Sequence, residues 1–195
     1  MSPNRTLTLI VSAALLAAAL PGRPAAAQGW YEKAVKGVSA KFEPAEAKPG
    51  QTVTFTLTLE LNPGYYTYPT TQPDKQAAAY TNTIKFPDPD AVVFVGSVAD
   101  PKDFQTKAEP DLGITELRTV QGKMTFTRKA VVSPKAAAGA ATVKLAAFKL
   151  SVCDATNCYP AKDVAVEAAL KVLDGPPVAV EKAYTDEVKK ALEKK

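Results

Sequence analysis

Strict alternation of apolar and polar residues marks the clearest element of the chain. Across residues 52–61, Val, Phe and Leu occupy every second position, and Thr and Glu fill the positions between them. Period-two alternation of this length predicts a β-strand with one buried and one solvent-exposed face. A Pro-Gly pair at 49–50 and Asn-Pro-Gly at 62–64 are turn residues, so the predicted strand is bounded on both sides.

Seven further segments show the same alternation, or a short apolar run between turn residues, and we expect each of them to form a strand. They are residues 38–42, 65–68, 81–86, 91–98, 124–132, 142–152 and 163–172. About eight short strands separated by Pro, Gly and Asp residues indicate an all-β fold, built as an antiparallel β-sandwich.

Two segments depart from simple alternation. Within residues 142–152 the apolar positions switch parity, from Val143 and Leu145 to Phe148 and Leu150. This switch predicts a β-bulge near Ala147. Residues 100–121 carry many charges and show weak periodicity, so we expect a long loop there, and long loops in compact domains are usually functional or mobile.

Both ends of the chain differ from the predicted sandwich, which we place at residues 38–175. Arg5, an apolar run of about 14 residues and Ala25–Ala27 form a secretory signal peptide at 1–27, and the run is too short to span a membrane. Residues 28–37 are a lead-in. After the Gly-Pro-Pro run at 175–177, apolar residues recur every four positions from Val180 to Leu192. Residues 176–195 are therefore predicted to be a proline linker and an amphipathic helix, which docks on the sandwich, frays or binds a partner.

Composition excludes several classes of function. The sequence contains no histidine, which excludes Ser-His-Asp and Cys-His nucleophile pairs and histidine-ligated zinc or copper. A net charge of +4 without a basic patch gives no reason to expect a nucleic-acid partner. We expect no cofactor and no metal, and a soluble periplasmic or secreted protein without a transmembrane segment after the signal peptide is removed.

The two cysteines of the chain, Cys153 and Cys158, lie on either side of a four-residue polar turn. An exported protein meets an oxidising environment in which they can pair. A disulfide that closes so short a loop stabilises a fold by only about 2 kcal/mol, so a structural staple and a redox-active pair both stay open. Capture of a soft ion such as Cu(I) by two thiolates is a third alternative. The turn carries Asp154 and no cation, which favours a disulfide attacked by the activated thiolate of a partner.

The sequence around the cysteines resembles a known family. The run C-D-A-T-N-C-Y-P at 153–160 is similar to the active-site hairpin of the N-terminal periplasmic domain of the thiol:disulfide interchange protein DsbD. Gly-Tyr-Tyr-Thr-Tyr at 64–68 resembles the G-Y-Y-x-Y strand of that domain, and Lys-Asp-Phe at 102–104 resembles its cap loop. Order and rough spacing agree over residues 38–173.

The resemblance implies an immunoglobulin-like sandwich whose cysteine pair relays reducing equivalents. Its partners would be thioredoxin-like proteins and a separate membrane thiol reductase, because no membrane bundle follows residue 173. In the family's pattern, Cys158 is the sulfur attacked and Cys153 the resolving partner. Tyr66 and Tyr68 would line the site.

Phe104 would shield the disulfide as a lid, with Asp103 as the one acid beside it where the family often has two. The alternative to this lid is that Phe104 anchors its segment into the core. For the whole protein, the alternative is a non-enzymatic immunoglobulin-like module that binds a protein partner and uses its disulfide as a staple.

Overall fold

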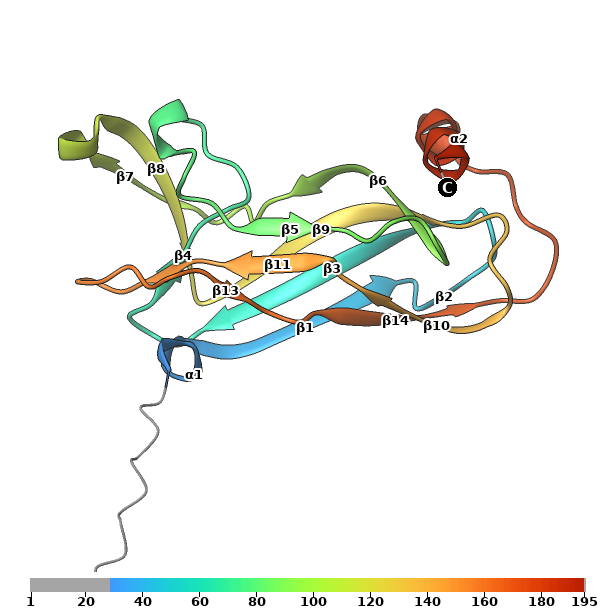
Figure 1. Ribbon diagram of the computed structural model, residues 1–195, viewed down its shortest axis with the longest axis horizontal. Coiled ribbons are helices and arrows are strands. Elements are labelled where there is room, and N and C mark those ends of the chain that lie inside the picture. Colours follow the sequence, from blue (N-terminus) through green and yellow to red (C-terminus); the bar gives the residue numbers. More distant parts are fainter. Residues whose placement is uncertain (1–28, 195) are drawn as a thin grey trace, which may run out of the picture.

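The described part of the chain is a β-sandwich. The computed structural model describes residues 29–194, so the predicted signal peptide lies outside the described residues. As expected, these residues form an immunoglobulin-like, mainly antiparallel β-sandwich with a short C-terminal helix (Figure 1).

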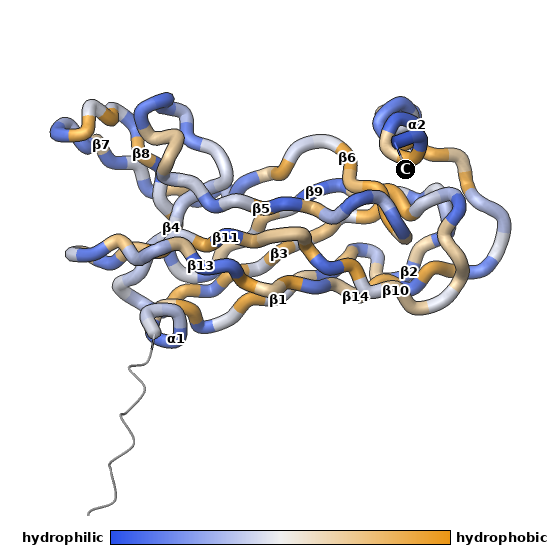
Figure 2. Tube along the Cα trace, in the orientation of Figure 1, coloured by the Kyte–Doolittle hydropathy of each residue, from blue (hydrophilic) through white to orange (hydrophobic). Residues whose placement is uncertain are grey.

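One layer is a continuous sheet in the order β1 (Val35–Glu43), β3 (Thr52–Leu61), β9 (Lys123–Val132) and β6 (Val92–Ala99). The bounds of β3 confirm the prediction for residues 52–61 at both ends. Its side chains at alternate positions, from Val53 to Leu61, are at most 3% exposed. Hydrophobic and hydrophilic positions alternate along the strands (Figure 2), because one face of the sheet is covered by the other layer.

The second layer consists of three short ladders. The first has the order β10 (Gly139–Lys144), β14 (Glu167–Val172) and β2 (Glu46–Ala47). The second has the order β13 (Lys162–Asp163), β11 (Ala147–Leu150) and β5 (Thr83–Lys85). The third has the order β12 (Val152–Cys153), β4 (Tyr66–Thr67), β8 (Ile114–Gln121) and β7 (Gln105–Glu109). The pairing of β14 with β2 is parallel. The two layers bury a common core that includes Phe55, Leu57, Phe126, Phe148, Leu150 and Leu170.

The parity switch in residues 142–152 has a different cause from the bulge that the sequence predicted near Ala147. β10 ends at Lys144 in the ladder with β14, and β11 begins at Ala147 in the ladder with β5 and β13. The chain therefore crosses between ladders at residues 145–146. After the crossing Phe148 and Leu150 are fully buried, so the opposite parity now faces the core.

The prediction of a long loop at residues 100–121 is wrong, because β7 and β8 form a hairpin there, joined by the 3₁₀ turn η2 (Pro110–Leu112). The side chains of β7 are almost all exposed, so no alternation marks it. On β8, Ile114 and Leu117 are buried at a spacing of three, and the register shifts between Lys107 and Glu109. Buried positions on β8 therefore follow no regular alternation, which is why a period-two pattern does not reveal this hairpin.

Helical turns lie at several points of the described chain. A five-residue helix, α1 (Trp30–Ala34), lies within the predicted lead-in, and two further 3₁₀ turns are η1 (Lys75–Ala77) and η3 (Lys182–Tyr184). No helix within residues 29–194 is long and apolar enough to cross a membrane.

The predicted C-terminal helix is present as α2 (Thr185–Glu193) and docks on the sandwich. Val188 is 4% exposed and packs with Val93, Val95 and Val131. The Glu187 carboxylate accepts a hydrogen bond from the backbone N–H of Gly96 at 2.9 Å. Of the three outcomes expected for this helix, docking is the one observed.

We expect Val188→Ala to lower the free energy of unfolding by about 1 kcal/mol. Loss of two buried carbon atoms costs about 1.6 kcal/mol, and the higher helix propensity of Ala returns about 0.5 kcal/mol. Urea unfolding measures the difference. The exposed neighbour Lys189→Ala is the control and should stay within about 0.5 kcal/mol of the unsubstituted protein; an equal loss in both variants would show that the docked face does not stabilise the fold.

Candidate functional site

Cys153 and Cys158 form a disulfide. The sequence predicted that the two cysteines can pair and left two roles open, a structural staple or a redox-active pair. Cys153 ends β12, and Cys158 faces it in an isolated antiparallel bridge, with 4.0 Å between their Cα atoms. The disulfide therefore closes the turn of a hairpin, residues 152–163, which we call the cysteine hairpin. This hairpin projects from the same end of the sandwich as β7 and β8, opposite the end that carries α2 (Figure 1).

The two cysteines differ strongly in burial. Cys153 is 1% exposed and belongs to a small apolar cluster with Tyr68, Ala77, Ile114 and Leu117. Cys158 is exposed. A second protein that approaches this end of the molecule therefore meets Cys158, whereas Cys153 lies behind it.

Tyr68 contacts both sulfur atoms. Its hydroxyl lies 3.1 Å from Cys153 Sγ and 3.7 Å from Cys158 Sγ, and its side chain is 3% exposed. Burial raises the pKa of Tyr68 well above its ordinary value, so the hydroxyl stays protonated and can act as a donor. Tyr66 pairs with Cys153 across the β4–β12 ladder, and its ring meets that of Tyr68 edge to face at 6.0 Å. The structure thus brings both predicted tyrosines to the disulfide.

A buried asparagine that the sequence reasoning missed ties the strands together beneath the disulfide. Asn82 is 2% exposed, and its side-chain amide donates to Tyr68 O at 2.6 Å and to Thr67 Oγ1 at 2.9 Å. Its side-chain oxygen accepts from Ser151 N at 2.9 Å. These bonds join the segment before β5 to β4 and to the start of β12, and so they fix Tyr68 against Cys153. A single Asn in a predicted strand gives no local signal of this role.

The turn of the cysteine hairpin is organised around Asp154. Its carboxylate accepts hydrogen bonds from the Tyr159 hydroxyl, from Thr156 N at 2.8 Å and from Asn157 N at 2.7 Å. The Tyr159 bond, followed by the two backbone bonds, holds the pKa of Asp154 far below its ordinary value. The same bond raises the pKa of Tyr159 to about 12, because ionisation would place two negative charges together. The turn therefore carries one fixed negative charge.

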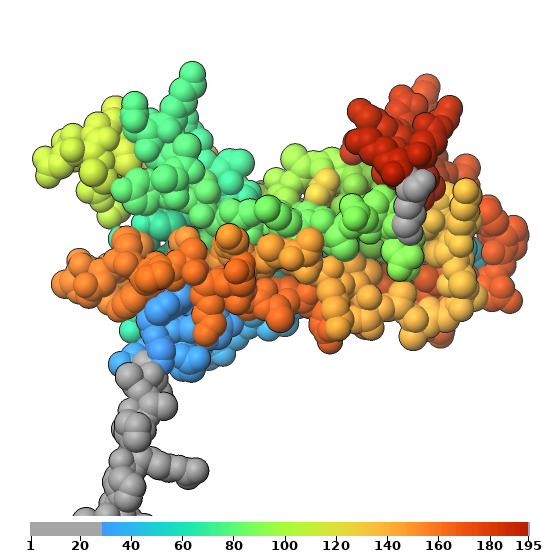
Figure 3. All heavy atoms as spheres, in the orientation of Figure 1, coloured from blue at the N-terminus to red at the C-terminus, as the bar shows by residue number. Residues whose placement is uncertain are grey.

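Two aromatic side chains from distant parts of the chain contact the Tyr159 ring of this turn. Trp30 on α1 stacks on the Tyr159 ring with 5.6 Å between centroids and 11° between planes. Tyr65 lies 6.4 Å from the same ring. Figure 3 shows α1 against the cysteine hairpin. Neither Trp30 nor Tyr159 was predicted as a site residue, since a stacking pair 129 positions apart leaves no local pattern.

Phe104 and Asp103 directly precede β7. Phe104 is half-buried, packs against the main core, and lies beneath the Arg118 guanidinium, with 5.1 Å from Cζ to the ring centroid. Asp103 is exposed. These contacts explain why a large apolar side chain occurs in this charged segment. That Phe104 shields the disulfide stays a prediction.

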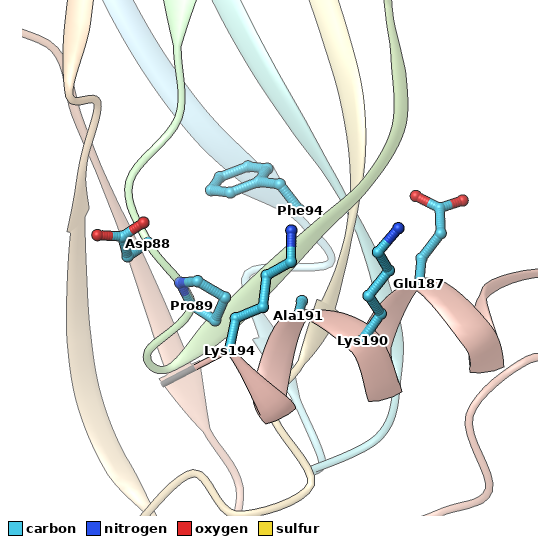
Figure 4. A pocket seen from close by; sticks show the side chains of 7 residues that line it. All are labelled: Asp88, Pro89, Phe94, Glu187, Lys190, Ala191 and Lys194. Carbon is cyan, nitrogen blue, oxygen red and sulfur yellow. The ribbon is translucent and has the colours of Figure 1, made fainter.

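A cavity beside α2 lies far from the cysteines. It has a volume of about 460 Å³ and lies between α2 and the segment before β6 (Figure 4); it is lined by Asp88, Pro89, Phe94, Glu187, Lys190, Ala191 and Lys194. Within residues 29–194 no three Cys, Asp or Glu side chains lie close enough together to hold a metal ion. Neither Cys153 nor Cys158 lines this cavity.

No protein-family model matches the chain, and no curated protein matches it. Among solved structures, the N-terminal periplasmic domain of ScsB from Proteus mirabilis is similar to it, with a TM-score of 0.42 and 16% sequence identity. The likeness covers 77% of this chain and 51% of that one, so the chain spans about half the length of that structure.

We expect the carboxyl of Asp154 to stay ionised to pH values well below the ordinary Asp range. A carboxylate with a lowered pKa stabilises the fold fully above its unfolded-state pKa, and this contribution is lost as the pH falls through the folded-state pKa. Carbon-13 NMR of the carboxyl group should show Tyr159→Phe shifting the titration midpoint upward. Tyr65→Phe, which removes a neighbouring hydroxyl, is the control. An unshifted midpoint in Tyr159→Phe would show that this hydroxyl does not stabilise the carboxylate.

Proposed function

We propose that this chain is an exported thiol–disulfide exchange module that relays reducing equivalents between thioredoxin-like proteins and a separate membrane thiol reductase. The observation that supports this best is the unequal burial of the two disulfide-bonded cysteines: Cys158 is exposed, and Cys153 is buried with its sulfur beside the Tyr68 hydroxyl. An exchange reaction needs one sulfur that a partner can reach and one that can leave.

The reaction begins when the thiolate of a partner dithiol attacks Cys158 Sγ. A partner–Cys158 disulfide forms, the Cys153–Cys158 bond breaks, and its electron pair goes to Cys153 Sγ, which leaves as a thiolate. The second thiolate of the partner then attacks the partner's own sulfur in the mixed disulfide and releases Cys158. The partner ends as a disulfide, and two electrons and two protons have passed to the Cys153–Cys158 pair. The reverse steps reduce the next disulfide.

Activation of the attacking thiolate has to come from the partner. The chain has no histidine, and the charge within the turn is the carboxylate of Asp154. A neighbouring negative charge disfavours a thiolate and so raises a thiol's pKa. The oxidised pair therefore serves as an electrophile, and a thioredoxin-like protein with a lowered thiol pKa is the matching nucleophile.

Tyr68 supplies a hydrogen-bond donor to the sulfur of Cys153, which leaves in the proposed reaction. As the disulfide breaks, negative charge develops on Cys153 Sγ in a buried, apolar environment. The Tyr68 hydroxyl already lies 3.1 Å from that atom, so it can donate a hydrogen bond to the thiolate without reorganisation. A hydrogen bond to a charged group is worth about 1.5–3 kcal/mol.

The first test separates the roles of the cysteines. We expect Cys153→Ala, which leaves the exposed thiol, to form a stable mixed disulfide with a single-cysteine thioredoxin variant whose active-site sulfur is first activated as a disulfide with 5-thio-2-nitrobenzoate; Cys158 attacks that disulfide and thionitrobenzoate leaves. Cys158→Ala leaves the buried thiol and should trap on the order of tenfold less. Non-reducing electrophoresis measures both yields. Equal yields would remove the assigned roles, and no trapping by either variant would favour a structural staple.

The second test concerns Tyr68. Tyr68→Phe keeps the ring and removes the donor, so we expect the rate constant for reduction by reduced thioredoxin to fall roughly 10- to 100-fold. Tyr184→Phe, which removes a hydroxyl beside α2 at the opposite end of the sandwich, is the control and should change the rate by no more than about twofold. Stopped-flow kinetics measures both. A Tyr68→Phe rate equal to that of the unsubstituted protein would show that this hydroxyl does not assist the leaving sulfur.

A further inference from the structure

A chain of contacts links the N-terminal helix to the redox-active turn. Tyr159 directly follows the exposed Cys158, and its ring stacks on Trp30 of α1. Its hydroxyl donates to the Asp154 carboxylate on the other side of the disulfide, and its backbone N–H donates to Val152 O at 2.9 Å. A rotation of the Tyr159 ring would break the stack and the hydroxyl bond together, so the position of Trp30 and the shape of the turn are coupled.

The helix α1 also contacts β13, three residues beyond Tyr159 in the same arm of the cysteine hairpin. Lys162 on β13 lies with its Nζ 4.6 Å from the Tyr31 ring centroid and 3.9 Å from the Glu32 carboxylate. Together with the Trp30–Tyr159 stack, this places two separate contacts from α1 on the arm of the hairpin that follows Cys158. Figure 3 shows α1 and the hairpin in direct contact at this end of the molecule.

The sandwich holds α1 in place from behind. Asn62, in the turn after β3, donates from its side-chain amide to Lys33 O and from its backbone N–H to Ala34 O, both at 2.8 Å. Ala34 is fully buried. A five-residue helix is unstable by itself, so these contacts and those to the hairpin are what keep it formed.

From this geometry we infer that α1 is a clamp that positions the cysteine hairpin for its partner, with Trp30 as the positioning residue. This inference rests on the proposed exchange function. Trp30 contacts no reacting atom; it acts through Tyr159 and Asp154 by fixing the turn that presents Cys158. The exchange reaction requires three sulfur atoms in line, so a small displacement of Cys158 slows reaction with a protein partner. A small thiol, which can approach from many directions, depends much less on this presentation.

The test compares Trp30→Ala, Trp30→Phe and the control Val178→Ala, which removes an exposed apolar side chain outside the clamp. For Trp30→Ala we expect the rate constant with reduced thioredoxin to fall on the order of tenfold, whereas the rate with dithiothreitol changes by no more than about twofold. Trp30→Phe keeps an aromatic ring for stacking and should restore most of the thioredoxin rate. Val178→Ala should match the unsubstituted protein in both reactions.

Amide hydrogen exchange measures the clamp without any partner. In Trp30→Ala, exchange of the Tyr159 and Asp154 amides, which bond to Val152 O and Asn157 O, should speed up by about tenfold or more, with the β3 amides unchanged. Unchanged exchange rates of the Tyr159 and Asp154 amides in Trp30→Ala would overturn the clamp. Faster exchange of these amides with an unchanged rate constant for reaction with thioredoxin would overturn the positioning role of Trp30. If the unsubstituted protein does not react with thioredoxin, the proposed function is overturned, and so is the role of Trp30 in positioning Cys158 for exchange. The exchange rates of the two amides would still show whether α1 holds the cysteine hairpin.

Discussion

The packing of Cys153 against Tyr68 gives the two ends of one disulfide different chemical environments. Cys153 is 1% exposed, and the Tyr68 hydroxyl lies 3.1 Å from its sulfur, whereas Cys158 is exposed five residues later. This difference sets the order of the proposed reaction. The partner attacks the sulfur of the exposed Cys158, and the Tyr68 hydroxyl donates a hydrogen bond to the sulfur of Cys153 as it leaves. Asn82 maintains the packing by bonding to Tyr68 O and Ser151 N.

The site therefore depends on the second, interrupted layer of the sandwich. The continuous β1-β3-β9-β6 sheet provides a regular buried face, whereas the other layer is divided into short ladders. The cysteine hairpin extends from one of its ends, and the side chains of the buried Asn82 and the ionised Asp154 bond to backbone groups that a regular ladder would have paired. The proposed function needs no cavity, since the proposed reaction partner is itself a protein.

The parts of this structure that follow from local pattern could be predicted, and those that follow from long-range contact could not. β3 was predicted to the residue because its two faces meet different environments. The β7–β8 hairpin was missed because β7 is exposed on both faces and leaves no alternation. Cys153, Cys158, Tyr66 and Tyr68 were identified from motif resemblance, and the structure places them together. Asn82, Tyr159 and Trp30 matter only because the fold brings distant segments together.

The reduction potential of the Cys153–Cys158 pair tests the central claim most directly, because it distinguishes an exchange pair from a staple. Equilibration of the protein with glutathione and thioredoxin buffers, followed by acid quench and mass spectrometry, measures it. The proposed function predicts a value between about −120 and −270 mV, the span of catalytic couples. A value below about −300 mV, which is characteristic of structural disulfides, would contradict it.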